Sequence, residues 1–196
     1  MSDLVASSNG GASDPATAVP GSDAGPEALI GAVPKAVAGD PFERMLWLLG
    51  RLNYVWTNTE SLLIHLIAGL ARTDKESATV IFLTLGSSTA RLSLVRRLAK
   101  LERVDAACRN EVLALAHDFD AVLKVRNRYN HCIYSFDEGR PSTILMRVQD
   151  RPDAIRMGKK EGLDAGSLRR VEEALARLGR ANRAIWSLVA RYDFPA

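Results

Sequence analysis

Cysteine is scarce in this chain of 196 residues, with only Cys108 and Cys132 present. Neither belongs to a CxxC pair, which argues against a disulfide framework and is consistent with a reducing compartment. No apolar run approaches the length of a membrane span. The N-terminus also lacks the basic start and apolar stretch of a signal peptide. These absences predict a cytoplasmic location with no membrane association.

Several common catalytic motifs are also missing. There is no P-loop, no Rossmann glycine motif and no GxSxG nucleophile motif. His65 and His117 are too few and too far apart for a metal site with Cys108 or His131, because no pair has HxxxH or HExxH spacing. We therefore expect no metal and no cofactor, and we expect His65 and His117 to be surface or half-buried residues.

Charge is unevenly distributed along the chain. Residues 1–40 hold five acids and one base, a net charge of −4, so the remainder carries +7 against a total of +3. The first segment is also rich in Gly, Ala, Ser and Pro and has no aromatic residue, which predicts a disordered tail over 1–40. The basic remainder can favour RNA, DNA or an acidic protein surface. A solvated Arg-rich surface is the simpler interpretation, and it also fits the basic run of Arg91, Arg96, Arg97, Lys100 and Arg103.

Helical periodicity dominates residues 41–196, which we interpret as one domain. Asp40-Pro41 has the form of an N-cap followed by a first-turn proline, and apolar residues then recur at helical spacing from Met45 to Leu70. A second helical segment is interrupted near Gly86, a third helix starts near Asp105, and the last begins between Asp164 and Ser167. Long helices with short connections prefer antiparallel packing. The prediction is an all-α fold, an antiparallel bundle of four main helices.

A short segment before the last helix has a different pattern. Asp137-Glu138-Gly139 is a turn signal, and Pro141 is incompatible with a helix interior. Apolar residues alternate on both sides of the turn-like run 150–153, at Ile144, Met146, Val148, Ile155 and Met157. This alternation predicts a small β-hairpin inserted before the last helix.

The third helix holds the sharpest functional signal. At about 100° per residue, an apolar stripe on this helix includes Arg126, with Leu115, Phe119, Val122 and Ile133 on the same face. A guanidinium at such a position needs a carboxylate, a backbone oxygen or a bound anion. Asn127 and His131 lie four residues apart, on the flank of that helix.

These residue types suit cleavage of a phosphodiester. A neutral histidine can take a proton from a ribose 2′-hydroxyl, and an arginine can hold the phosphate and stabilise charge in the transition state. An amide can orient either group. Such a reaction needs no metal ion.

The string 125–131, Val-Arg-Asn-Arg-Tyr-Asn-His, resembles the R-x4-6-H signature of the HEPN superfamily, including the polar residue after its arginine. That superfamily comprises helical bundles, often dimers, of toxin, phage-defence and RNA-processing systems, and many members are metal-independent ribonucleases. The resemblance implies a homodimer whose composite site uses Arg126 and His131, with Asn127 in support. It also implies RNA as a partner, beside an antitoxin or a nucleotidyltransferase. A related pattern, R-x4-H-x-Y, marks family members whose tyrosine is modified by a partner nucleotidyltransferase, and Tyr134 lies one residue later than that pattern requires.

A noncatalytic interpretation of the same residues remains open. Arg126 can form a buried ion pair with Glu60 that fixes the register of two helices without catalysis. The chain would then be a helical interaction or regulatory module, and His131 would cap a helix or pack beside the hairpin.

Overall fold

The computed structural model describes residues 34–35, 39–156 and 158–196. The predicted disordered tail falls almost wholly outside these residues and stays a prediction. The described helices are α3 (Pro41–Ser61), α4 (Leu63–Ala71), α5 (Lys75–Thr84), α6 (Ser88–Ala99), α7 (Ala106–Asn130) and α8 (Ala165–Arg191). The described strands are β1 (Cys132–Asp137), β2 (Arg140–Leu145), β3 (Gln149–Arg151), β4 (Ala154–Arg156) and β5 (Lys160–Gly162).

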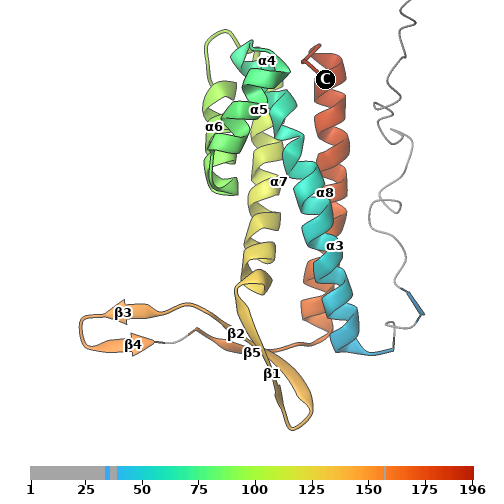
Figure 1. Ribbon diagram of the computed structural model, residues 1–196, viewed down its shortest axis with the longest axis vertical. Helices are drawn as coiled ribbons and strands as arrows, with labels where there is room; N and C mark the ends of the chain where they lie inside the picture. The colour runs from blue at the N-terminus through green and yellow to red at the C-terminus, as the bar shows by residue number, and fades with distance from the viewer. Residues whose placement is uncertain (1–33, 36–38, 157) are drawn as a thin grey trace, which may run out of the picture.

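Three long helices form the body of the molecule. Figure 1 shows α3, α7 and α8 running side by side, with α4, α5 and α6 gathered at one end and the strands at the other. α8 packs against both α3 and α7, while α6 packs against α7 and α4. The chain is therefore mostly helical, as predicted, whereas a bundle of four main helices is not confirmed.

Aspartates begin the long helices where the sequence indicates. Asp40, Asp105 and Asp164 each accept hydrogen bonds from backbone N–H groups of the first turn that follows. Such caps satisfy donors that have no partner inside the helix. The helix starts near residues 41, 105 and 165 are thereby confirmed.

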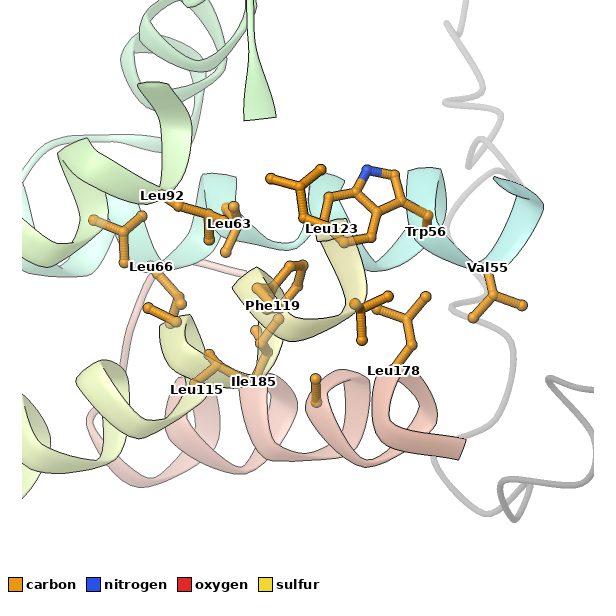
Figure 2. Packing of buried hydrophobic residues seen from close by; sticks show 14 of the residues in the cluster. Val55, Trp56, Leu63, Leu66, Leu92, Leu115, Phe119, Leu123, Leu178 and Ile185 are labelled. Atoms are coloured by element: carbon orange, nitrogen blue, oxygen red, sulfur yellow. The ribbon is translucent and has the colours of Figure 1, made fainter. Parts of the chain in front are cut away.

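The hydrophobic core lies between the helices. Trp56 of α3 meets Phe119 of α7 edge to face, with ring centroids 5.4 Å apart. Leu178 and Ile185 of α8 approach the same layer (Figure 2), and all four side chains are almost completely buried. Because Trp56 and Phe119 belong to different helices, their contact holds α3 against α7, the helix whose C-terminal half contains Arg126 and Asn127.

The β region is larger than the single small hairpin predicted. β1 and β2 pair antiparallel, and β5 adds to the other edge of β2. The two residues that join β1 to β2, Glu138 and Gly139, have φ values of 50° and 76°. Such a turn matches the twist of a tight hairpin, and Gly139 adopts its left-handed conformation without steric cost.

The predicted hairpin around residues 150–153 is present but shorter than expected. It consists of β3 and β4, joined at Pro152 and Asp153. Ile144, which the alternation assigned to this hairpin, belongs instead to β2 and pairs with Ile133 of β1. The alternation was misassigned because two hairpins follow each other directly in the sequence. Met157 lies outside the described residues.

Candidate functional site

Arg126 lies half-buried on the side of α7 that faces α3. Its Nε donates a hydrogen bond of 3.0 Å to Oδ1 of Asn53. Its guanidinium carbon lies 5.6 Å from the centre of the Trp56 ring, in a cation–π arrangement. The position therefore comes from two residues of α3, one polar and one aromatic.

An amide pair completes this arrangement. Asn130 lies one turn after Arg126, and its Nδ2 donates to Asn53 Oδ1 at 2.8 Å. In return, Asn53 Nδ2 donates to Asn130 Oδ1 at 3.1 Å and to the backbone oxygen of Leu49 at 3.0 Å. These bonds leave the Asn53 amide one orientation, with its oxygen toward Arg126.

Among the described residues, no carboxylate oxygen lies within 4.0 Å of a guanidinium nitrogen of Arg126, so its charge has no ion-pair partner there. The alternative pairing with Glu60 is wrong. Glu60 binds Arg91 of α6 instead, with Nη1 of Arg91 3.2 Å from Oε2 of Glu60. The same oxygen accepts a hydrogen bond of 3.2 Å from Nε1 of Trp56. Sequence spacing placed Glu60 near the right face of α3, but α6 reaches it and α7 does not.

Asn127 and His131 lie exposed on the neighbouring flank of α7. His131 is the C-cap residue, and its backbone N–H donates to the carbonyl of Asn127 at 3.2 Å. At about 100° per residue, Arg126 with Asn130 and Asn127 with His131 form two adjacent rows on the helix surface. Within the described residues, no hydrogen bond joins the His131 ring to Arg126.

The helix ends earlier than the apolar stripe suggests. α7 stops at Asn130, so Cys132 and Ile133 belong to β1, and Ile133 is 53% exposed. Leu115, Phe119 and Val122 are buried as expected. Ile133 was wrongly placed on the helix because β1 begins directly after His131, with no turn residue to mark the boundary.

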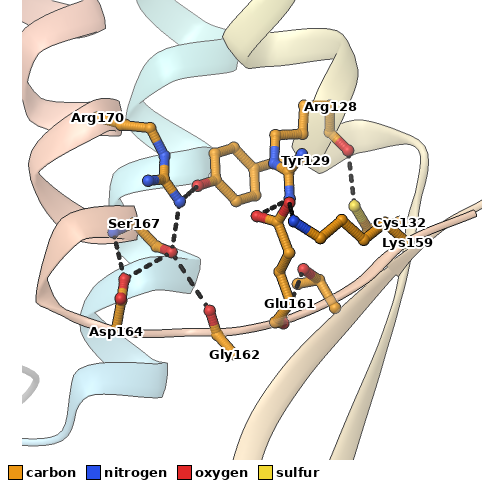
Figure 3. A network of polar contacts seen from close by, with 10 residues as sticks. Arg128, Tyr129, Cys132, Lys159, Glu161, Gly162, Asp164, Ser167 and Arg170 are labelled. Atoms are coloured by element: carbon orange, nitrogen blue, oxygen red, sulfur yellow. Dashed lines mark hydrogen bonds and ion pairs between the residues drawn. The ribbon is translucent and has the colours of Figure 1, made fainter.

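Two further residues of the motif string, Arg128 and Tyr129, point into a polar network (Figure 3). Arg128 forms an ion pair with Glu161 of β5, and its carbonyl accepts a hydrogen bond from Cys132 Sγ at 2.7 Å. The hydroxyl of buried Tyr129 accepts a hydrogen bond of 3.4 Å from Arg170 of α8. Arg128 and Tyr129 thus anchor the end of α7 to the sheet and to α8, and this holds Asn127 and His131 in place.

Tyr134 is also part of the anchored region. Its hydroxyl donates a hydrogen bond of 3.0 Å to the Tyr129 carbonyl, and burial raises the pKa of Tyr134 to about 12. A neutral hydroxyl engaged with the backbone is a poor nucleophile. The geometry gives no support to a modified tyrosine at this position.

Three pockets among the described residues are not lined by Arg126, Asn127 or His131, although the smallest, of about 110 Å³ between α7 and α8, is lined by the neighbouring Val125. A pocket of about 470 Å³ lies between α4, the start of α7 and residues 192–195, and it is bordered by Cys108, whose pKa burial raises. A second, of about 430 Å³, lies between α7 and α8. Because Asn53 and Arg126 are half-buried while Asn127 and His131 are exposed, the candidate site lies at the surface along α3 and α7.

Two histidines lie elsewhere. His117 is exposed on α7, as expected. His65 is only 7% exposed and its Nδ1 lies 2.7 Å from the Pro195 carbonyl oxygen, so the prediction of a surface or half-buried residue is wrong. The C-terminal residues pack over the end of α4 and cover it. No cluster of three or more metal-ligating side chains occurs in the described part of the chain.

Sequence reasoning missed Asn53 and Asn130. Asn130 belongs to the quoted string but received no role, although it lies four residues after Arg126. Asn53 interrupts the apolar stripe of α3, and that interruption was the available signal. Its partner on α7 became visible only when the two helices were placed side by side.

Comparison with protein-family models, with curated proteins and with solved structures finds no match to this chain. None of the described helices is long and apolar enough to cross a membrane. The HEPN resemblance therefore rests on the residues of the motif and on the helical architecture around them.

Proposed function

We propose that this chain is a HEPN-like RNA-binding protein that cleaves RNA without a metal ion. The observation that carries the proposal is that Arg126 has no ion-pair partner among the described residues. The neutral amide of Asn53, itself held by Asn130, accepts the hydrogen bond of its Nε, and no carboxylate among the described residues neutralises its charge. Its two terminal nitrogens remain for a bidentate contact with a phosphate, the geometry that a guanidinium matches best.

His131 supplies the acid–base chemistry in this proposal. As a neutral imidazole it takes the proton of a ribose 2′-hydroxyl, and the 2′-oxygen forms a bond to phosphorus while the bond to the 5′-oxygen breaks. The 5′-oxygen receives a proton, so the products are a 2′,3′-cyclic phosphate and a 5′-hydroxyl. Arg126 stabilises the charge that develops on the phosphate oxygens, and Asn127 orients the RNA beside His131.

The oligomeric state that we propose is the one implied by the resemblance to the HEPN superfamily. Two copies form a homodimer, and each contributes an Arg126 and a His131 to the composite site. α3 with α4, then α6, α7 and α8 are the four main members of its antiparallel bundle. We place the protein in the cytoplasm, in a toxin or defence system with an antitoxin or nucleotidyltransferase as its partner.

Cleavage in the presence of EDTA tests the proposal. Purified protein is incubated with a mixture of RNA sequences, beside His131→Ala and Arg126→Ala. We expect fragments with cyclic phosphate ends from the unaltered protein, and a loss of at least about 100-fold in rate for each variant, the scale of general acid–base and electrostatic effects.

His117→Ala is the matched control, because His117 is an exposed histidine on the same helix. It should cleave like the unaltered protein, and circular dichroism should show equal helix content in all forms. A substrate with 2′-deoxyribose at the cut position should stay intact. No cleavage by the unaltered protein, or equal cleavage by all variants, would remove the catalytic assignment.

A noncatalytic interaction module is the second candidate. It is favoured by exposed apolar side chains on α5, where Val80 is 61% and Leu83 is 67% exposed. Contiguous apolar residues on a surface commonly mark a protein contact. Val80→Ser with Leu83→Ser should then abolish association in analytical ultracentrifugation, while Arg126→Ala and His131→Ala leave every measured property unchanged.

A further inference from the structure

The β3–β4 hairpin stands away from the helices. Figure 1 shows it projecting sideways from the base of the molecule. We call this hairpin, together with the adjoining residues 146–148 and 158–160, the arm. β3 and β4 contain three residues each. A two-stranded hairpin of this size is at best marginally stable in water.

The arm is positively charged. It contains five basic and two acidic residues, so its net charge of +3 equals that of the whole chain. Arg147 and Arg156 are exposed, and the described residues offer them no ion-pair partner. Lys159 is 82% exposed, at 3.8 Å from Glu161.

The arm starts at the candidate site. The backbone N–H of Met146 donates a hydrogen bond of 2.8 Å to the carbonyl of His131. Arg147 follows at once in the chain. The basic side chains of the arm therefore continue outward from the end of α7, where Asn127 and His131 are exposed.

We infer that the arm binds the phosphate backbone of the RNA strand on which Arg126 and His131 act. Arg147, Arg156 and Lys159 would contact successive phosphates and direct the strand toward His131. This inference rests on the proposed function and adds the element that holds the substrate. Neutralising phosphates with basic side chains supplies most of the sequence-independent affinity for nucleic acids.

A protein partner fits the arm less well. Ile155 is 68% exposed, but Asp150 lies directly opposite it in the hairpin and shares its face. Val148 is 59% exposed and precedes β3. The acid beside Ile155 interrupts any continuous apolar surface, whereas the excess of positive charge suits a polyanion.

The test measures binding in the His131→Ala background, so that cleavage does not interfere. The arm variant combines Arg147→Ala, Arg156→Ala and Lys159→Ala, and a fluorescent single-stranded RNA of about 20 nucleotides reports binding by anisotropy. Affinity should fall by about 10- to 100-fold at roughly 0.1 M salt, and the slope of log affinity against log salt should become shallower by about 2. The control combines Lys75→Ala, Arg97→Ala and Lys100→Ala, which removes the same charge at the opposite end of the molecule.

The outcomes distinguish a failure of the inference about the arm from a failure of the proposed ribonuclease activity. Equal weakening by the two triple variants overturns the inference, since net charge alone would then explain binding. Weakening of RNA binding by Val148→Ser with Ile155→Ser, without an effect of the basic triple, also overturns it, because apolar and not basic side chains of the arm would then carry the affinity. If the unaltered protein cleaves RNA while the arm variant binds normally, the arm fails and the ribonuclease stands. If the arm variant loses binding but no form cleaves, the arm stands and catalysis fails.

Discussion

Two arginines contact α3 in similar ways and end in opposite electrostatic states. Arg91 lies over the Phe82 ring at 4.0 Å and binds the buried carboxylate of Glu60. Arg126 lies over the Trp56 ring at 5.6 Å and binds the amide of Asn53. Asn53 and Glu60 are about two turns apart on one face of α3.

The difference shows how one helix face can hold a structural cation and an available one. Arg91 is neutralised, and it also donates to the Phe82 carbonyl at 3.1 Å, so it joins α3, α5 and α6. The Arg126 guanidinium keeps its net charge, because an amide orients it without cancelling it. The first pattern contributes stability, and the second suits anion binding.

Removal of the Glu60 carboxylate should have the largest effect on stability. Glu60→Ala leaves Arg91 without its partner in a largely buried position, and this should lower the free energy of unfolding by about 3 kcal/mol. Asn53→Ala at the half-buried counterpart should lower it by only about 1 kcal/mol. Urea unfolding followed by circular dichroism measures both, and equal losses would contradict the distinction between the two arginines.

Giving Arg126 a carboxylate partner, as Arg91 has in Glu60, should reduce RNA binding. Asn53→Asp offers Arg126 a carboxylate of the same shape as the amide, and the guanidinium becomes neutralised. We expect affinity for RNA in the His131→Ala background to fall by about 10-fold. The slope of log affinity against log salt should become shallower by about 1, which corresponds to one lost phosphate contact. Asn58→Asp, an exposed position on the same helix, is the control for the added negative charge. An equal loss in both variants would show that Arg126 has no special role.

Half-buried Tyr134, which follows the motif string, should have a smaller, pH-dependent effect on the free energy of unfolding. The pKa of Tyr134 is raised from 10.0 to about 12 because burial disfavours the phenolate. The unfolded chain therefore releases this proton first, so the contribution of Tyr134 is complete below about pH 10 and is lost as the pH rises toward 12. Between pH 9.5 and 11.5 the unaltered protein should lose more unfolding free energy than Tyr134→Phe, and parallel curves would refute this.

Local patterns predicted the starts of the three long helices well. Asp40, Asp105 and Asp164 cap helices because a carboxylate accepts from the next turn whatever the rest of the fold does. The sheet was predicted poorly. The turn at Glu138 and Gly139 was recognised as a turn, but its strands were not, because β1 follows α7 without a break.

The sequence by itself determined a mostly helical chain and put Arg126, Asn127 and His131 at the end of one helix, since spacing along a helix is a local property. Only the tertiary structure decided which partners they meet. The position of α6 brings Arg91 into an ion pair with Glu60, and the position of α7 beside α3 brings Arg126 into a hydrogen bond with Asn53. Partner choice depends on how distant helices are placed side by side, and no short sequence window contains that information.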